Sequence, residues 1–373
     1  MIFNEKTLNE LSIDGRGSYG IGASAVEYSD DLYTYLRITD INDDGTLNLK
    51  DLKSVNDEKA SEYLLKPNDI VFARTGASTG RNYFYDGTDG EFVYAGFLIK
   101  FSIDSQKVNP KFVKYFCLSD VYKGWIHSFN TGSTRGNINA KTLGGMPIPV
   151  PPRAQQDGIV SILSDIDKKI RINKEINDNL EQQAFALFDS LFPAVSAGEN
   201  SIGDYITPKR GKNLLSKNAV FGDIPVVAGG LEPSTYHNVA NTSSPVLTIS
   251  ASGANSGFVR LWDIPVWSSD SSYIDVTMTP HVYFWYVMLK KRQKEIYDSQ
   301  TGSAQPHIYP QHIAVMPVVE LNDEDVNSFT EQVTPLFRMI GANVEENNRL
   351  ASVRDALLPH LMSGELDVSD INL

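Results

Sequence analysis

The second half of this chain repeats the first half at a fixed offset of 170 residues. The loop at 130–138 reads NTGSTRGNI, and the loop at 300–308 reads QTGSAQPHI. The register then holds to the C-terminus through the pairs Met146/Met316, Ile170/Ile340, Asn173/Asn343, Asn177/Asn347, Leu180/Leu350, Leu187/Leu357 and Leu191/Leu361. This period is far longer than a solenoid unit, so we interpret the repeat as a duplicated domain. A duplicated domain gives one chain a pseudo-twofold axis, which suits a target with two half-sites.

Length and composition indicate a globular chain of more than one domain. The 373 residues exceed what one hydrophobic core usually serves. No run of about 18 apolar residues predicts a membrane span, and residues 1–11 lack the apolar core of a signal peptide. The one cysteine, Cys117, is compatible with a reducing compartment. We therefore expect a cytoplasmic protein with no membrane partner.

The net charge of −13 at first argues against a nucleic-acid partner. The charge is uneven, however, because residues 321–373 hold 3 Lys and Arg against 10 Asp and Glu. Residues 199–320 are nearly neutral, with basic clusters at 209–212 and 290–294. A neutral domain can bind DNA through such a local patch. The acidic C-terminal segment could face a protein partner or could be solvated surface.

Four segments follow one another, namely 1–150, 151–194, 199–320 and 321–373. The first and third are mixed, with strand-like runs at 69–73, 97–101 and 246–250. Each also carries a predicted helix that begins at a proline, at 110–125 and at 280–294. The pattern therefore predicts a mixed α/β fold with two globular domains related by the internal repeat.

The second and fourth segments read as long helices over about 152–192 and 322–362. Apolar residues recur at spacings of three and four, which is typical of a coiled-coil seam. Paired seams would make the helices antiparallel, with the globular domains at the two ends of a rod of roughly 50 Å. We expect Pro335 and Pro359 to kink or interrupt the second helix.

Two asparagines interrupt the seam of each helix near its middle. In an antiparallel pair, Asn173 would approach Asn347 and Asn177 would approach Asn343. Buried polar seam residues fix the register of a coiled coil at some cost in stability. The alternative is that these are partly exposed seam positions with no special role.

A glycine-containing loop follows a strand in both copies, at 74–81 and at 251–257. Such a loop exposes backbone N–H groups and hydroxyls that suit phosphate contact, and arginine can also read guanine. The candidate DNA-binding residues here are Arg74, Thr75, Ser78, Arg81, Ser252 and Asn255. The alternative is a tight turn that needs glycine for its backbone angles.

The repeated loops at 130–138 and 300–308 have the same frame with different polar side chains. That pattern fits a scaffold that presents different base-reading groups, since Arg, Asn and Gln make bidentate base contacts. The candidates are Thr131, Ser133, Arg135, Asn137, Ser303, Gln305 and His307, together with the basic cluster Lys209, Arg210 and Lys212. The alternative is an ordinary polar loop with glycine turns.

Motifs for catalysis are not found. The sequence has no Walker loop, no Gly-x-Ser-x-Gly, no His-Glu-x-x-His and no paired cysteines. The six histidines are scattered, so we predict no metal site and no catalytic residue. Dispersed carboxylates could still form a site.

Four short runs, in this order within a duplicated frame, make the whole chain resemble the specificity subunit of Type I restriction–modification systems. The runs are 67–76 (PNDIVFARTG), 146–156 (MPIPVPPRAQQ), 301–308 (TGSAQPHI) and 357–366 (LLPHLMSGEL). The family often has Glu-Gln after the proline-rich run, where this chain has Gln155-Gln156, and the second copy lacks that run.

The resemblance implies a non-catalytic reader of a bipartite DNA target. Two target-recognition domains would each read half of the sequence, and the repeated helices would set the gap and dock two methyltransferase subunits. S-adenosylmethionine, and ATP with Mg²⁺ where a restriction subunit joins, would belong to those partners, so this chain would hold no cofactor. The alternatives are a DNA-modifying enzyme with an unrecognised site and a protein-interaction scaffold that kept the frame.

Overall fold

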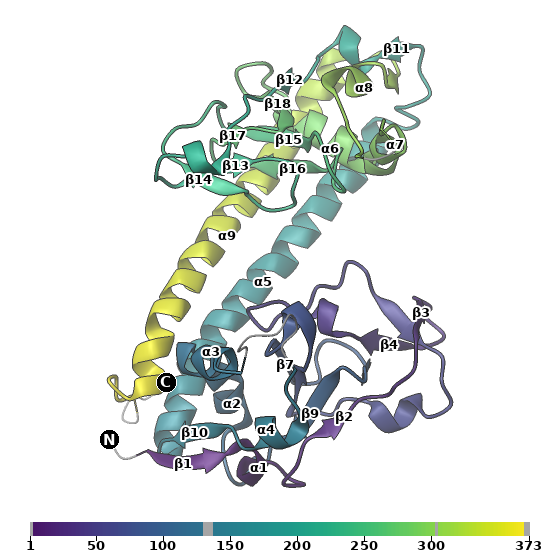
Figure 1. Ribbon diagram of the computed structural model, residues 1–373. Helices are drawn as coiled ribbons and strands as arrows, with labels where there is room; N and C mark the ends of the chain where they lie inside the picture. The colour runs from purple at the N-terminus through teal and green to yellow at the C-terminus, as the bar shows by residue number, and fades with distance from the viewer. Residues whose placement is uncertain (1–2, 130–136, 303–304, 369–373) are drawn as a thin grey trace. The chain divides into compact units, whose positions relative to one another are not determined.

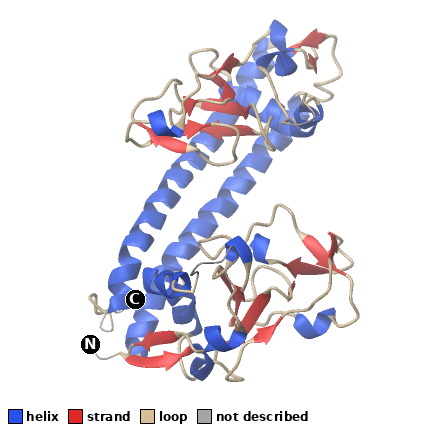
Figure 2. Cartoon of the chain, in the orientation of Figure 1, coloured by secondary structure: helices blue, strands red, loops and turns tan. Residues whose placement is uncertain are grey.

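The computed structural model describes residues 3–129, 137–302 and 305–368 (Figure 1). The chain forms two compact units, one of Met1–Lys169 with Arg349–Leu373 and one of Ile170–Asn348. Two long helices, α5 (Arg153–Leu191) and α9 (Asp323–Ser363), contribute to both units. Strands, short helices and loops make up the rest of each unit (Figure 2). The predicted mixed α/β class is confirmed.

The first unit contains two four-stranded sheets and one two-stranded ribbon. The sheet orders are β2-β9-β6-β7 and β3-β5-β4-β8, and β1 pairs with β10. The strands are β1 (Asn4–Thr7), β2 (Ser18–Tyr19), β3 (Ala25–Glu27), β4 (Tyr33–Leu36), β5 (Lys53–Val55), β6 (Asp69–Ala73), β7 (Asn82–Tyr85), β8 (Phe92–Tyr94), β9 (Leu98–Ser102) and β10 (Pro147–Val150). The α-helices are α1 (Leu8–Leu11), α2 (Pro110–Phe116), α3 (Asp120–His127) and α4 (Ala140–Gly144), with 3-10 turns η1 (Ile38–Asp40), η2 (Ala60–Tyr63) and η3 (Gly76–Ser78).

The second unit repeats this plan with a smaller second sheet. The orders are β12-β18-β15-β16 and β14-β13-β17, and β11 pairs with β19. The strands are β11 (Asn200–Ser201), β12 (Lys209–Arg210), β13 (Ile224–Val227), β14 (Thr235–His237), β15 (Val246–Ser250), β16 (Val259–Trp262), β17 (Trp267–Ser268), β18 (Ser271–Asp275) and β19 (Pro317–Val318). The α-helices are α6 (Val282–Lys291), α7 (Gln293–Asp298) and α8 (Pro310–Ala314), with 3-10 turns η4 (Ile202–Asp204) and η5 (Ser216–Asn218).

Two of the predicted helices are shorter than expected. The helix predicted over 110–125 is two helices, because Ser119 caps α3 by accepting a hydrogen bond from the Tyr122 N–H. The helix predicted over 280–294 is likewise divided, between α6 and α7. A local apolar pattern cannot distinguish one bent segment from one continuous helix.

We expected each proline to kink or interrupt α9, and neither proline interrupts it. The helix runs unbroken through Pro335 and Pro359. Phe329, Val333 and Phe337, on either side of Pro335, are buried in the core of the second unit. This packing holds the helix together where the lost backbone hydrogen bond would otherwise break it.

The two helices pair antiparallel within the second unit through the asparagines of their seams. The Asn173 side-chain amide donates to Asn347 Oδ1 over 2.9 Å and to Glu346 Oε2 over 2.7 Å. The Asn343 amide donates to Asn177 Oδ1 over 2.8 Å. These are the two asparagine pairs that the antiparallel seam predicts. Asn173 is buried, so the alternative of exposed seam positions does not hold for it.

Candidate nucleic-acid interface

The same bridge joins the two repeated loops in both units. Thr75 pairs with Asn137 in the first unit, and Ser252 pairs with His307 in the second. The backbone hydrogen bond beside it is also repeated, since Ile138 N donates to Arg74 O and Ile308 N donates to Ala251 O, both over 2.9 Å. Loops that lie more than fifty residues apart in the sequence therefore meet at one place in each unit. We call this place the loop junction.

The glycines of the first loop are explained by backbone geometry. Gly76 and Gly80 have φ of 74° and 89°, and Gly253 and Gly257 have φ of 84° and 91°. An added Cβ at Gly80 would lie 2.5 Å from Ile126, and one at Gly257 would lie 2.9 Å from Ile296. The tight-turn interpretation therefore accounts for the glycine spacing, and phosphate contact stays a prediction.

At the loop junction of the first unit, Arg74 lies over an aromatic ring. Its guanidinium carbon is 5.1 Å from the centroid of the Tyr19 ring, a cation–π contact. The Tyr19 hydroxyl accepts a hydrogen bond from Ala140 N over 3.1 Å, which ties the ring to the start of α4. Within the described part of the chain, Arg74 Nε is buried without a hydrogen-bond partner. Among the described residues, Arg74 is thus a positioned cation without an ion-pair partner.

The second unit carries its arginine on the neighbouring strand instead. Ala251 takes the place of Arg74, and Arg210 lies on β12, the edge strand that corresponds to β2 with Tyr19. Arg210 Nη2 donates to Asp270 Oδ1 over 2.6 Å, and the Ser252 hydroxyl donates to Asp270 Oδ2. This loop junction therefore presents a charge pair rather than a lone cation.

The other predicted residues differ in how accessible their side chains are. Arg81 pairs with Asp43, with Nε 2.7 Å from Oδ1 and Nη2 3.1 Å from Oδ2. Ser78 is buried, whereas Asn255 is half-buried in the turn. Lys209, Lys212 and Gln305 are exposed. Thr131, Ser133, Arg135 and Ser303 lie outside the described residues.

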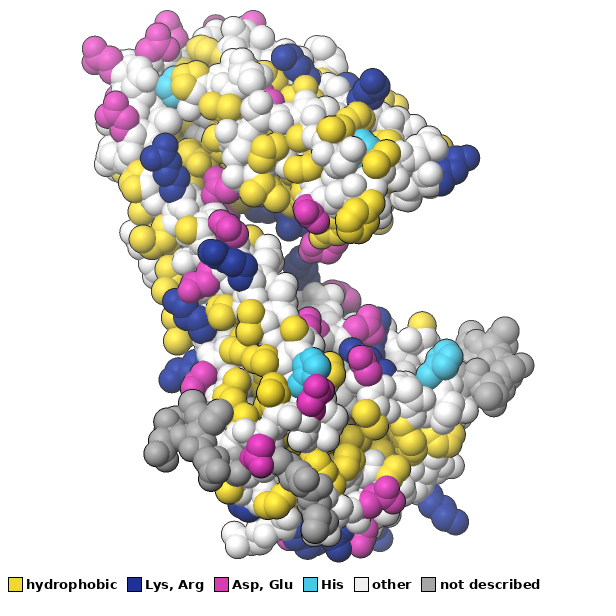
Figure 3. All heavy atoms as spheres, turned by 90° about the vertical axis from the view of Figure 1, so that its left-hand side faces the viewer, with side chains coloured by type: hydrophobic (Ala, Val, Ile, Leu, Met, Phe, Trp, Pro, Cys, Tyr) yellow, Lys and Arg dark blue, Asp and Glu magenta, His cyan; other side chains and the backbone are white. Residues whose placement is uncertain are grey.

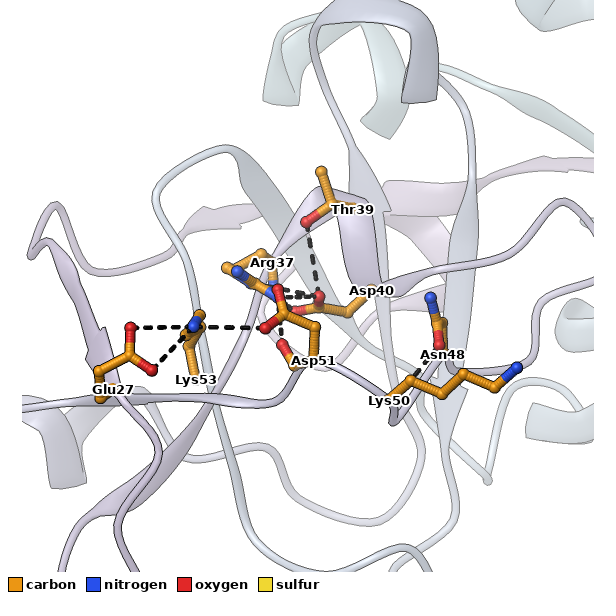
Figure 4. A network of polar contacts seen from close by, with 8 residues as sticks. All are labelled: Glu27, Arg37, Thr39, Asp40, Asn48, Lys50, Asp51 and Lys53. Atoms are coloured by element: carbon orange, nitrogen blue, oxygen red, sulfur yellow. Dashed lines mark hydrogen bonds and ion pairs between the residues drawn. The ribbon is translucent and has the colours of Figure 1, made fainter. Parts of the chain in front are cut away.

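One stretch of the first unit has the sequence spacing of a calcium-binding loop, and Figure 4 shows the polar network around it. Residues 40–51 have the Asp-x-Asn-x-Asp-Gly spacing of a calcium loop, with Asp51 at the last ligand position. The Arg37 guanidinium instead contacts the residues at the first and last ligand positions. Its Nη2 lies 2.6 Å from Asp40 Oδ1 and 3.4 Å from Asp51 Oδ2. Lys53 also pairs with Asp51, over 3.3 Å, and with Glu27. The Asp40 and Asp51 carboxylates are therefore already paired with side-chain cations.

The described residues hold no group of three or more His, Cys, Asp or Glu placed to bind a metal ion. No helix in the described ranges is both long enough and apolar enough to cross a membrane. Cys117 is buried, and burial raises the pKa of its thiol, so it is not a reactive nucleophile.

Tyr19 and Asp270 were not identified from the sequence. Tyr19 lies in a two-residue edge strand and Asp270 in a turn, and neither has a local pattern that marks it. Each is brought to its loop junction by strand pairing over long sequence separations. Only a comparison of the two copies of the repeat, extended to the strands beside the glycine loop, could have indicated these two residues.

Comparisons with known proteins point to one family. The family model for the Type I restriction modification DNA specificity domain matches residues 23–182. A protein of Mycoplasma pneumoniae named as a type I specificity subunit is 26% identical over 284 residues, covering 69% of this chain and 74% of that protein. The specificity subunit of the MjaIX enzyme of Methanocaldococcus jannaschii is 24% identical over 310 residues, covering 72% of each.

A solved structure shares the fold over nearly the whole chain. The S subunit of a Type-I restriction-modification system from M. genitalium superposes with a TM-score of 0.56 at 21% identity, covering 96% of both chains. The duplicated architecture with two paired helices is therefore a known fold.

Proposed function

We propose that this chain is a DNA specificity subunit of a Type I restriction–modification system, that it is not itself catalytic, and that it reads a two-part DNA sequence. The reading domains in this proposal are residues 1–150 and 199–320, one for each half-site. The observation that carries the proposal is the repeated bridge, which builds one loop junction in each unit. Two similar junctions with different polar side chains suit two half-sites of different sequence.

The two loop junctions differ in what they could read. Arg74 offers a guanidinium whose Nε has no hydrogen-bond partner among the described residues, and guanidinium donors match the O6 and N7 acceptors of guanine or a phosphate. The pair of Arg210 and Asp270 adds a carboxylate acceptor, which suits the amino group of cytosine. We propose that these side chains discriminate bases in the two half-sites, with Thr75, Asn137, Ser252 and His307 supplying neighbouring contacts.

The helices are the proposed docking surface for two methyltransferase subunits. The face in Figure 3, which looks onto the side of α9, shows hydrophobic side chains exposed between charges of both signs. Met339, Val344 and Val353 of α9 are about half exposed. In this proposal S-adenosylmethionine, and ATP with Mg²⁺ if a restriction subunit joins, are bound by those partners. The site of action is the compartment that holds the DNA, the cytoplasm.

A genome-wide map of methylated bases tests the function. The source strain is compared with a strain that lacks this gene and with the same strain after the gene is restored. We expect one two-part adenine motif to lose methylation on deletion and to regain it on restoration. A motif set that is identical in all three strains, with the methyltransferase subunits expressed, contradicts the proposal.

Arg74→Ala is expected to relax or abolish reading of one half-site only. A lost bidentate contact to guanine costs about 1–3 kcal/mol of discrimination, or roughly five- to 150-fold. The measurement is the same methylation map, made with the variant gene. Arg81→Ala is the matched control, because Arg81 is neutralised by Asp43 and its loss should leave both half-sites intact. Equal loss of base discrimination at the two half-sites would contradict the assignment of Arg74 to one half-site.

We propose that Asn173, Asn177, Asn343 and Asn347 fix the register of the helices and with it the unread gap. Replacing Asn173 and Asn347 together by leucine removes a polar pair in which Asn173 is buried, so unfolding should occur at higher temperature. The methylated motifs should then contain unread gaps of more than one length. Asn173→Leu alone should destabilise the protein, since Asn347 loses its donor. One unchanged gap length in the double variant would count against the register role.

A further inference from the structure

The most exposed aromatic side chain of the second unit is Phe221. It is 97% exposed, and its neighbours Val220 and Leu215 on the same loop are 55% and 50% exposed. The loop connects β12 to β13 and contains the short turn η5. We call these three exposed apolar side chains of one loop the Phe221 tip. Grouped exposure of this kind marks an interaction site more often than a single exposed side chain does.

The backbone that carries the Phe221 tip is held in place. Val220 N donates to His237 Nδ1 over 3.0 Å, and the His237 ring lies edge-on to Trp267 at 5.1 Å. Gly222 lies so close to β14 that an added Cβ would be 2.4 Å from Asn238 Cα. The ring is therefore presented by an anchored loop, which lowers the ordering cost of binding.

The other end of the loop is anchored beside the loop junction. Trp267 Nε1 donates to Lys212 O over 2.8 Å, and Leu214 N donates to the Ser269 hydroxyl over 2.9 Å. Lys212 N donates to Ser268 O over 2.9 Å, and Arg210 binds Asp270 at the loop junction itself. One continuous segment thus connects the proposed base-reading residues to the Phe221 tip.

The charge of this segment indicates which class of molecule the Phe221 tip contacts. Residues 207–222 contain four cations and no Asp or Glu, and the four are Lys209, Arg210, Lys212 and Lys217. All four are exposed, and among the residues described by the structure only Arg210 forms an ion pair. A cationic surface with an apolar tip matches DNA, where phosphates surround a stack of bases. An apolar pocket on a protein would not require this uniform positive charge.

We propose that Phe221 inserts between neighbouring base pairs in or beside the half-site read by the second unit, while the lysines contact flanking phosphates. Apolar side chains inserted in this way unstack a base step and bend the duplex. A sequence that unstacks easily would then be favoured without any hydrogen bond to its bases. This inference rests on the proposed function, and it names a contact that the polar candidates do not include.

The test uses the complex of this chain with its methyltransferase subunits and duplexes that carry the recognised sequence. A 2-aminopurine is placed at successive steps through and beside the half-site of the second unit. On binding, its fluorescence should rise at one step with the native protein and with Phe221→Trp. Phe221→Ala should abolish that rise and weaken binding roughly tenfold, the scale of one lost stacking contact.

Ile264→Ala is the matched control, because Ile264 is also exposed in the second unit but lies outside the loop. This variant should keep both the fluorescence rise and the affinity. Since Phe221 is almost fully exposed, the Phe221→Ala variant should have the same unfolding temperature as the native protein. This measurement separates a binding defect from misfolding.

Two results overturn the inference. One is an unchanged affinity and fluorescence profile in Phe221→Ala. The other is loss of the methyltransferase subunits from the purified Phe221→Ala complex, which would place the ring in a protein contact. Failure of the proposed function itself appears earlier and differently, as a native complex that does not prefer the two-part sequence over unrelated DNA.

Discussion

Replacing Phe188 by alanine is expected to destabilise the second unit by about 3–5 kcal/mol, the usual cost of truncating a buried phenylalanine. Phe188 lies on α5, is 1% exposed and contacts three other rings. Its centroid lies 5.0 Å from that of Phe192, 5.7 Å from Phe284 and 5.5 Å from Phe329. Phe188 belongs to α5, Phe192 follows the end of that helix, Phe284 belongs to α6 and Phe329 to α9, so one truncation loosens the attachment of both long helices to the domain.

Tryptophan fluorescence during denaturant unfolding can measure this loss. Three of the four tryptophans, Trp262, Trp267 and Trp285, lie in the second unit, so the signal reports mainly on that unit. Phe185→Ala is the matched control, because Phe185 lies on the same helix but is only partly buried. It should lose less than half as much stability. An unchanged midpoint for Phe188→Ala would show that the cluster does not hold the unit together.

Replacing Asp167 by alanine is expected to loosen the first unit by about 2–3 kcal/mol, because a partly buried charge network loses its centre. Asp167 Oδ2 accepts hydrogen bonds from Lys114 Nζ and from the Tyr115 hydroxyl, both over 2.9 Å. Asp167 Oδ1 lies 3.2 Å from Arg354 Nη1. The Asp167 side chain is 25% exposed, so solvent screens part of this energy.

The network also predicts how the stability of the first unit depends on pH. Burial alone would raise the pKa of the Asp167 carboxyl, but Lys114, Tyr115 and Arg354 outweigh burial and hold this pKa below its ordinary value. A carboxyl with a lowered pKa stabilises the folded state above the ordinary pKa of about 4. That contribution is lost as the pH falls below this value and passes through the folded-state pKa. Asp167→Ala should remove this part of the acid sensitivity.

Hydrogen exchange of the peptide over α2 is the measurement, at pH values above and below 4. The second copy of the repeat supplies a matched control, in which Asp167, Lys114 and Arg354 are replaced by the residues found 170 positions away. Those residues are Phe337, Phe284 and Ala184. The triple variant should regain most of the protection that Asp167→Ala loses, because a well-packed apolar cluster can replace a buried ion network. Equal protection in native protein and Asp167→Ala would contradict the role of the network.

The long helices and their alignment could be predicted from the sequence because they depend on a local, repeated pattern. The seam residues predicted the extents of α5 and α9 to within one or two residues and the two asparagine contacts. The continuity of α9 through Pro335 could not be predicted, because it depends on burial of Phe329 and Phe337 against residues distant in sequence.

The loop junctions could be predicted only in part. The repeat identified the two loops that meet, and glycine chemistry identified the turn. The cation–π contact of Arg74 with Tyr19 and the pairing of Arg210 with Asp270 arise from edge-strand pairing, which leaves no local pattern. The family resemblance supplied the role of the chain, which no individual residue established.

The exchange of a charged for an apolar cluster between the two copies has a consequence for how the halves choose partners. Duplication at first makes two identical interfaces, and either half could then pair with a second copy of itself. Here Asp167 and Arg354 meet in one unit, whereas the equivalent Phe337 and Ala184 belong to an apolar core in the other. Two copies of the second half would bury Arg354 opposite Phe337 with no carboxylate, which is costly. The difference between the two clusters is therefore expected to disfavour pairing of the second half with a copy of itself.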